Sequence, residues 1–230
     1  MHEVNVPQEV IDRTIERRGE LHPLADFDPA AAALVVVDMQ GFFIDRVPMA
    51  QNIVANINRL AAGVRAAGGS VIWVVMTVEE QDTRQWSHFY RKLLSPADTR
   101  AHLEHLQRDS TQWQVWHALD VQASDEIVEK RRFSAFIQGS SDLQARLQRK
   151  GIRTLLITGT VTNVCCESTA RDAMMLDYES IMVADGCAAL TDEAHLASLC
   201  NFQTIFGDVL TVDDLLAHLA AGSRAAQASG

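Results

Sequence analysis

Three side chains with complementary chemistry, Asp38, Lys130 and Cys165, each stand at or just after the end of a predicted β-strand. A cysteine can attack a carbonyl carbon, and a carboxylate can accept the thiol proton and return it to a leaving amine. A lysine beside them holds the carboxylate in place and favours the charged pair. Because such groups titrate together, we assign no separate pKa to any one of them from the sequence. The set predicts hydrolysis through a covalent cysteine intermediate.

The stretch 155–173 is typical of an apolar strand, a tight turn and a helix that begins near a cysteine. The helix dipole and the free N–H groups of a first turn favour a thiolate there. Backbone N–H groups of Val161 and Cys165 are placed at this turn to stabilise an oxyanion. The alternative is that Cys165 and Cys166 are small buried packing residues, the commonest fate of a free cysteine.

Alternating apolar runs and helical periodicities predict an α/β fold. The expected strands span 32–37, 70–76, 126–130, 154–158, 180–184 and 209–210, and the expected helices span 49–67, 141–150, about 165–177 and 192–206. We expect a three-layer α/β/α, Rossmann-like arrangement around a central, mostly parallel six-stranded sheet. Ligands bind outside the carboxyl ends of parallel strands, which is where the three side chains would meet.

The chain is expected to form one domain over residues 31–220, preceded by a polar arm at 1–30 and followed by a disordered tail at 221–230. The arm contains a possible short helix that would pack on a neighbouring subunit. Residues 77–124 form an irregular insertion rich in aromatic and histidine side chains. Such an insertion either shapes the substrate site as a lid or covers one edge of the core.

Composition limits the kinds of partner and compartment. The 230 residues carry a formal net charge of −10 without a long basic run, which argues against nucleic acid or an anionic membrane as partner. The sequence has no apolar run of membrane-spanning length and no signal-peptide pattern, so we expect a cytoplasmic protein acting on a small molecule. The four cysteines have neither metal-finger spacing nor disulfide density, and we expect no metal and no cofactor.

Three segments resemble the signature segments of the isochorismatase-like cysteine hydrolases. They are Val35–Gln40, Glu129–Phe136 and Gly159–Cys165, in the order and spacing of that family, and the resemblance covers residues from about 30 to 212. It implies an isochorismatase-like fold and self-association as a homodimer or homotetramer.

The resemblance also implies the roles of individual residues. Asp38, Lys130 and Cys165 correspond to the family's catalytic triad, and a non-proline cis peptide is implied at Thr160-Val161. The family usually has a small aliphatic residue where this chain has a second cysteine. Because neighbouring helical positions point about 100° apart, we assign the nucleophile to Cys165 and a packing role to the next residue.

The segment around the nucleophile is most similar to the ureidoacrylate hydrolase and N-carbamoylsarcosine amidase branch, whereas the lysine segment also resembles isochorismatases. We therefore expect cleavage of a C–N bond in a small amide, ureide or carbamoyl compound. Candidate substrate-binding residues are Phe43, Trp86, Arg131, Phe136 and Asn163. A substrate carboxylate would suit an Arg131 or Arg132 that reaches the cleft; the alternative is that one or both arginines make surface or inter-subunit contacts. The region around Trp86-Ser87-His88 lacks the aspartate of the nicotinamidase metal segment.

Two alternatives stay open. The first is an isochorismatase-type vinyl ether hydrolase in which Asp38 acts as the acid and the thiol is not needed. The second is a binding protein that retains the fold without catalysis.

Overall fold

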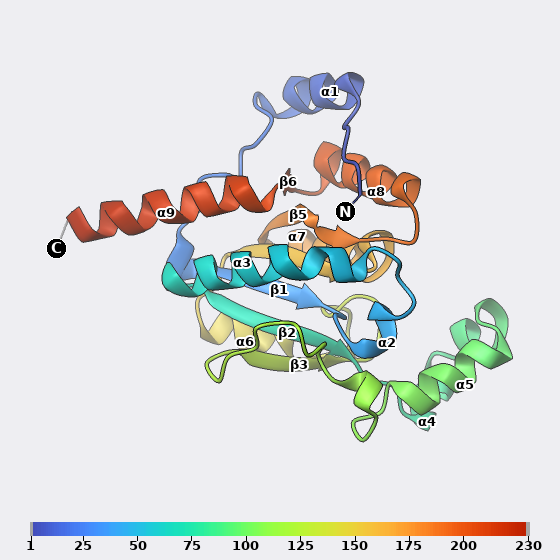
Figure 1. Cartoon of the computed structure of the whole chain (residues 1–230). Helices are drawn as coiled ribbons and strands as arrows, with labels where there is room; N and C mark the ends of the chain where they lie inside the picture. The colour runs from blue at the N-terminus through green and yellow to red at the C-terminus, as the bar shows by residue number, and fades with distance from the viewer. Residues whose placement is uncertain (1, 229–230) are drawn as a thin grey trace.

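One parallel sheet lies at the centre of the chain in its computed structural model, which describes residues 2–228 and their side chains as far as residue 221 (Figure 1). Its strands are β1 (Ala32–Val37), β2 (Ser70–Met76), β3 (Glu126–Lys130), β4 (Thr154–Thr160), β5 (Glu179–Ala188) and β6 (Asp208–Leu210). They lie in the order β3-β2-β1-β4-β5-β6, and every neighbouring pair is parallel. The predicted α/β/α fold with a six-stranded sheet is confirmed, and the sheet is parallel throughout.

Helices cover both faces of this sheet (Figure 1). The α-helices are α1 (Gln8–Arg18), α2 (Gly41–Ile44), α3 (Val54–Ala66), α4 (Glu80–Gln85), α5 (Pro96–His105), α6 (Leu143–Arg149), α7 (Glu167–Met175), α8 (Asp192–Ile205) and α9 (Val212–Ala228). Short 3-10 or π-helical turns are η1 (Pro29–Ala31), η2 (Ala50–Ile53), η3 (Phe89–Leu93), η4 (Thr111–Trp113) and η5 (Thr162–Cys166). Helices α3 and α9 pack on one face, and α6, α7 and α8 pack on the other.

Strand β1 shows why an uninterrupted apolar run forms the middle of such a sheet. Leu34 and Val36 belong to the core on the α3 side, whereas Val35 and Val37 belong to the core on the α7 side. Successive side chains of a strand point to opposite faces, so a strand covered on both faces needs apolar residues at every position. Burying both faces of β1 fixes its carboxyl end, where Asp38 follows, against the neighbouring strands.

The N-terminal arm folds back onto its own chain. Helix α1 lies beside α8 (Figure 1), and the Arg18 guanidinium donates hydrogen bonds to the carbonyl oxygens of Gln203 at 2.6 Å and Gly207 at 2.9 Å. The structure therefore shows a contact partner for the arm within the same subunit.

The C-terminal segment continues as helix α9 through Ala228. The tail that we expected to be disordered, residues 221–230, is thus helical over most of its length, and residues 229–230 lie outside the described residues. Alanine, which recurs in this segment, has the highest helix propensity of all residues, so a small-residue composition does not by itself predict disorder.

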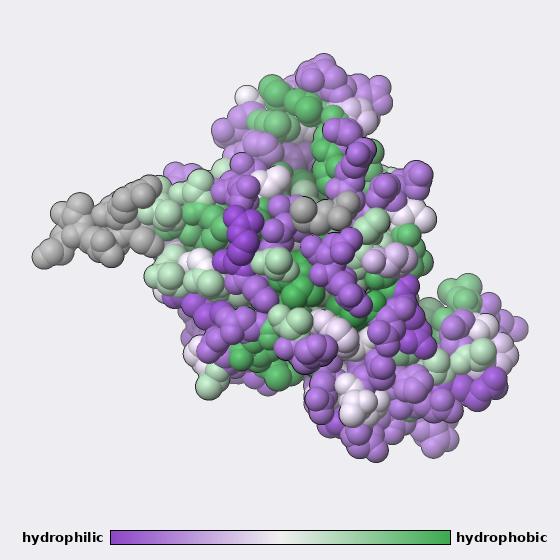
Figure 2. All heavy atoms as spheres, in the orientation of Figure 1, coloured by the Kyte–Doolittle hydropathy of each residue, from purple (hydrophilic) through white to green (hydrophobic). Residues whose placement is uncertain are grey.

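Most of the insertion at 77–124 forms a lobe beside the carboxyl ends of β2 and β3, containing α4, η3, α5 and η4 (Figure 1). Its last part returns to the core on the α3 side, where Leu119 is buried. Buried Tyr90 and Leu106 join Phe42 and Met76 in a third, smaller apolar cluster that attaches the lobe to the sheet. Hydrophilic residues cover most of the lobe on the face shown in Figure 2, and α5 buries none of its residues. The lobe is therefore held at its base and exposed at its far end.

Candidate active site

Asp38, Lys130 and Cys165 lie in contact at the carboxyl edge of the sheet. The Lys130 Nζ atom is 2.8 Å from Asp38 Oδ2 and 3.5 Å from Cys165 Sγ. Asp38 and Lys130 are fully buried, and Cys165 is only 4% exposed. The three side chains named from their positions after predicted strands are thus brought together into one buried cluster.

The end of β1 places Asp38 through an unusual backbone conformation. Asp38 has a φ of 51°, in the left-handed region, while its N–H donates to the carbonyl oxygen of Val74 at 2.8 Å. A non-glycine residue in this region costs free energy and tends to occur where function requires it. The Thr160 hydroxyl donates to the Asp38 carbonyl oxygen at 2.9 Å, which ties this bend to the end of β4.

Lys130 is held by more than its ion pair. Its ammonium donates to the carbonyl oxygen of Arg132 at 3.0 Å and lies 3.6 Å from Met76 Sδ. A buried ion pair is tolerated when further hydrogen bonds satisfy its members, and removal of one partner leaves an uncompensated charge. Lys130 therefore connects the catalytic cluster to the loop that follows β3.

The surroundings of Cys165 favour the protonated thiol. Burial raises the pKa of Cys165 well above its usual range; the positive charge of Lys130 opposes this rise, and the negative charge of Asp38 adds to it. This differs from the thiolate that the helix start alone would favour, because burial of the sulfur penalises its charged form. The resting thiol needs a base at the moment of attack.

The other two groups of the cluster, Asp38 and Lys130, lie at ion-pair distance, 2.8 Å from Nζ to Oδ2. Burial raises the pKa of Asp38 even though Lys130 acts to lower it. Burial acts to lower the pKa of Lys130, but Asp38 and Cys165 beside it raise that pKa overall. The geometry leaves Asp38, 2.8 Å from the Lys130 ammonium, as the group of the cluster that can accept a proton from the thiol.

The turn before the nucleophile begins where β1 and β4 approach closely. Gly159 has a φ of 111°, and a Cβ built on it would lie 2.0 Å from the Val37 carbonyl oxygen. The peptide bond between Thr160 and Val161 is cis, at the position that the family resemblance implies. Residues of η5 then lead into α7, and Cys165 lies within η5, two positions before Glu167, the first residue of that helix.

Cys166 lies in a different environment from Cys165. It is fully buried, and its Sγ is 3.7 Å from the Thr158 carbonyl oxygen, among the side chains of the core on the α7 side. Neither Lys130 nor Asp38 makes a hydrogen bond with it within the part of the chain that the structure describes. This environment fits a packing residue.

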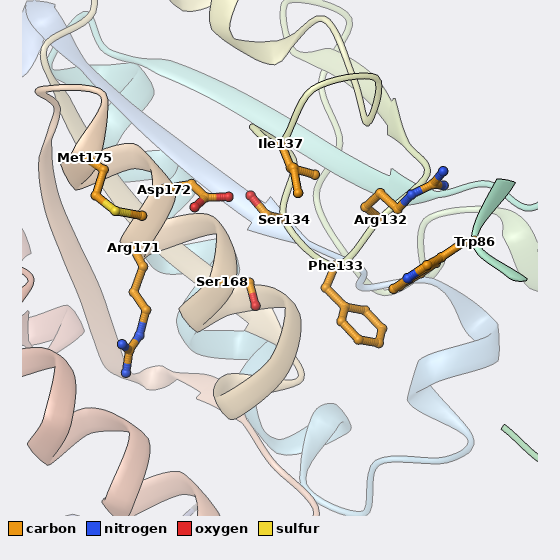
Figure 3. A pocket seen from close by; sticks show the side chains of 9 residues that line it. All are labelled: Trp86, Arg132, Phe133, Ser134, Ile137, Ser168, Arg171, Asp172 and Met175. Atoms are coloured by element: carbon orange, nitrogen blue, oxygen red, sulfur yellow. The ribbon is translucent and has the colours of Figure 1, made fainter. Parts of the chain in front are cut away.

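A pocket of about 520 Å³ lies between α7 and the loop after β3 (Figure 3). Its lining includes Trp86 from the lobe, Arg132 and Phe133 from the loop, and Ser168 from α7. Ser168 follows Cys165 by three residues, and Arg132 supplies the carbonyl oxygen that accepts from Lys130. The pocket thus adjoins residues that neighbour the cluster, but Asp38, Lys130 and Cys165 themselves do not line it.

Of the five predicted substrate-binding residues, Trp86 lines this pocket and the other four do not. Phe43 packs against the third apolar cluster, and the Phe136 ring lies 5.7 Å from that of Tyr178. Asn163 is exposed on η5. The lobe thus contributes at least one side chain, Trp86, to the wall of the pocket.

The two adjacent arginines have different roles. Arg131 donates to Asp82 Oδ2 at 2.6 Å and Glu79 Oε1 at 2.9 Å, so its guanidinium is already paired. Arg132 lines the pocket, and its guanidinium carbon lies 5.2 Å from the centre of the Trp86 ring. The sequence could have indicated this difference only through the acidic residues around Asp82, because nothing in the Arg131-Arg132 pair itself distinguishes its members.

Within residues 2–228, no group of three or more His, Cys, Asp or Glu side chains is arranged to hold a metal ion. No helix among the described residues is both long and apolar enough to span a membrane.

Comparison with known proteins shows which family and which relatives the chain is similar to. Residues 32–214 match the family model described as Isochorismatase domain. The ureidoacrylate amidohydrolase RutB of Pseudomonas savastanoi pv. phaseolicola is 35% identical over 229 residues, which cover 92% of this chain and 91% of that protein. RutB of Variovorax paradoxus is 34% identical, with 82% of this chain and 81% of that protein covered.

The chain is also similar in structure to solved hydrolases. A cysteine hydrolase from Pseudomonas syringae pv. phaseolicola matches with a TM-score of 0.74 and 26% identity, covering 86% of this chain and 96% of that chain. An N-carbamoylsarcosine amidase from Thermoplasma acidophilum matches with a TM-score of 0.64 and 26% identity, covering 79% and 96% of the two chains.

Proposed function

The chain belongs to the isochorismatase family, and we propose that it is a cysteine-dependent amidohydrolase that cleaves a C–N bond of a small ureido, carbamoyl or amide compound. The observation that carries this proposal is the buried contact of Lys130 with both Asp38 and Cys165. The activities for which the RutB relatives and the N-carbamoylsarcosine amidase are named support the same class of bond.

The first half of the reaction forms a thioester. As Cys165 Sγ attacks the substrate carbonyl carbon, its proton passes to Asp38, which leaves a tetrahedral oxyanion. The C–N bond then breaks, Asp38 returns the proton to the leaving nitrogen, and the acyl group stays on sulfur. General-base assistance of this kind suits a thiol whose pKa is raised by burial.

The second half releases the acyl group. Water attacks the thioester carbon and gives a proton to Asp38, and the returning proton regenerates the Cys165 thiol as the acid leaves. Lys130 stays charged throughout and keeps the carboxylate in place. Backbone N–H groups of Val161 and Cys165, at the turn before α7, are proposed to stabilise the oxyanion in both halves.

A panel of variants tests this assignment. We expect Cys165→Ala to abolish hydrolysis of ureidoacrylate, N-carbamoylsarcosine and simple primary amides, because no other thiol contacts Lys130 and Asp38 in the described part of the chain. The matched control is Cys166→Ala, which removes the neighbouring packing thiol and should keep turnover. The measurement is steady-state release of ammonia or amine.

The same panel separates the remaining alternatives. Turnover of a vinyl ether that survives Cys165→Ala but is lost in Asp38→Asn would replace the amidohydrolase by an acid-catalysed vinyl ether hydrolase. Absence of turnover of every compound by the unmodified protein, together with an unreactive Cys165 thiol, would instead favour a binding protein.

A further inference from the structure

Helix α8 places a histidine against the turn that carries the nucleophile. His195 lies in the first turn of α8 and is fully buried. Its Nδ1 atom is 2.8 Å from the hydroxyl oxygen of Thr162, which is fully buried too. Thr162 is the first residue of η5 and directly follows Val161. The bond therefore joins α8 to the turn between the two proposed oxyanion donors, Val161 and Cys165.

The His195 ring is an uncharged imidazole near neutral pH. Burial, followed by the effect of nearby His2, lowers the pKa of His195 to about 4. A neutral imidazole has one nitrogen that donates and one that accepts, and a threonine hydroxyl can do either. The bond between His195 and Thr162 is therefore compatible with both tautomers, and it is a fixed contact rather than a pH-dependent one near neutrality.

The N-terminal arm covers one face of this histidine. The His2 ring stacks on the His195 ring, with 4.3 Å between their centres and 20° between their planes. The segment before α1 runs down to the start of α8 (Figure 1), and the His2 side chain is only 1% exposed there. Its Nε2 accepts from the Ala189 N–H at 2.9 Å, and its Nδ1 lies 2.5 Å from Asp192 Oδ1. Both nitrogens of His2 are thus bonded, and the arm holds the His195 ring in place.

Helix α8 also bonds to the start of α7. The hydroxyl of buried Ser198 donates to Glu167 Oε2 at 2.6 Å. Glu167, the first residue of α7, follows the nucleophile in the sequence, whereas Thr162 precedes it. The Ser198 bond therefore attaches α8 beyond Cys165, while the His195 bond ends on the residue next to Val161.

From these contacts we propose that His195 is a positioning residue for the oxyanion hole, and that His2 of the N-terminal arm keeps it in place. An oxyanion hole works only when its N–H groups are held at the position where negative charge develops. The bond from His195 restrains Thr162, whose backbone lies between the two donors. The inference rests on the proposed function, because it takes this turn as the part of the site that stabilises the oxyanion.

Two reagents distinguish the oxyanion hole from the thiol. Iodoacetamide alkylates Cys165 by displacement: the S–C bond forms, the C–I bond breaks, and iodide and the thiol proton are released without an oxyanion. Acetaldehyde instead adds the thiol across its carbonyl group, so that the S–C bond forms and the carbonyl oxygen, at the oxyanion position, takes up the thiol proton. Protection of the Cys165 peptide by acetaldehyde against alkylation, followed by mass spectrometry, thus measures the oxyanion hole separately from thiol reactivity.

Removal of either partner of the bond should weaken only the oxyanion hole. We expect His195→Leu and Thr162→Val each to raise the half-protecting acetaldehyde concentration about tenfold, part of the roughly 100- to 1,000-fold in kcat that loss of a whole oxyanion donor costs. Alkylation without aldehyde should stay nearly unchanged. For amide hydrolysis kcat should fall with little change in KM, because the oxyanion contact is made only in the transition state. The double variant should lose no more than either single variant, because both side chains act through one bond.

A conservative variant and a matched control separate positioning from support of the fold. His195→Asn should restore most of the protection, because its amide places a polar atom where Nδ1 stood, whereas His195→Gln should not. His2→Ala should cause a smaller shift in the same direction. The control is Ser198→Ala, which removes the other buried bond of α8 and should leave protection and kcat unchanged. Because valine is close to threonine in volume, Thr162→Val tests the bond even if His195→Leu does not fold.

The outcomes also separate this inference from the proposed function. If no amide or ureide is hydrolysed but aldehyde protection depends on His195 as described, the proposed function fails and the positioning role stands. If Cys165-dependent hydrolysis proceeds equally in the unmodified protein, His195→Leu and Thr162→Val, the positioning role alone fails. Equal losses of alkylation and protection, or the same loss in Ser198→Ala, would show that His195 only supports the fold. Absence of aldehyde protection in the unmodified protein overturns the role as well.

Discussion

At the scale of single residues, the ammonium of Lys130 organises the site. It contacts the proposed base Asp38, the proposed nucleophile Cys165 and the Arg132 carbonyl oxygen. All three side chains of the cluster are nearly excluded from water, which strengthens their electrostatic interaction. The protonation of Asp38 therefore governs whether the thiol can be activated.

The pH dependence of activity follows from the raised pKa of Asp38. Asp38 must be unprotonated to accept the thiol proton, and burial raises its pKa above the usual value of 3.8. As pH falls, kcat/KM should therefore decline at a pH clearly above the pKa of an ordinary aspartate. The apparent pKa of this decline belongs to the coupled cluster.

Measurement of kcat/KM from about pH 4 upward tests this expectation. Circular dichroism over the same range controls for unfolding at low pH. Full activity of the folded protein at about pH 4 would contradict the assignment of a buried carboxylate as base.

At the scale of elements, the site depends on how closely the carboxyl ends of β1 and β4 approach each other. Gly159 pairs with Val37, the last residue of β1, and Asp38 directly follows Val37 in the sequence. Only a residue without a side chain fits there, because a Cβ would meet the Val37 carbonyl oxygen at 2.0 Å. The position of the base is thus set by a backbone contact one residue away.

Substitution of Gly159 by Ala should damage both stability and activity. The φ of 111° and the contact with Val37 together should cost more than about 3 kcal/mol in the free energy of unfolding. Activity of the remaining folded protein should also fall, because relief of the clash moves Asp38. Urea unfolding and kcat measure the two effects.

The matched control is Gly151→Ala at the end of α6. Gly151 also has a positive φ, 68°, but a Cβ there meets nothing within 4 Å. This variant should lose only about 1 kcal/mol of stability and keep full activity. Equal losses in the two variants would show that the close approach of β1 and β4 is not what positions the site.

Most elements and the catalytic cluster were predictable because their signals are local. Continuous apolar runs bounded by glycine or polar residues predicted the strands, and the parallel topology places strand ends at one edge. The end of β5 was less predictable: the strand runs to Ala188 although Asp185 and Gly186 interrupt its apolar pattern.

At the scale of the whole molecule, the parts that resisted prediction depend on distant contacts. Arg132 rather than Arg131 lines the pocket because Asp82, which lies 49 positions earlier in the chain, pairs with Arg131. Likewise, the arm lies on α8 through bonds from Arg18 to residues more than 180 positions away. A sequence pattern carries no direct signal for either arrangement, since each requires the folded sheet to bring the partners together.

The proposed mechanism depends on one thiol, that of Cys165, so trapping this thiol as an acyl adduct tests the account most directly. The protein would be mixed with ureidoacrylate or an N-carbamoyl amino acid, quenched in acid within one turnover and digested for mass spectrometry. We predict an added acyl mass on the peptide that contains both cysteines, assigned to Cys165 by fragmentation, present in Cys166→Ala and absent in Cys165→Ala. Rapid product release without any adduct on Cys165, or an adduct that persists in Cys165→Ala, would contradict the account.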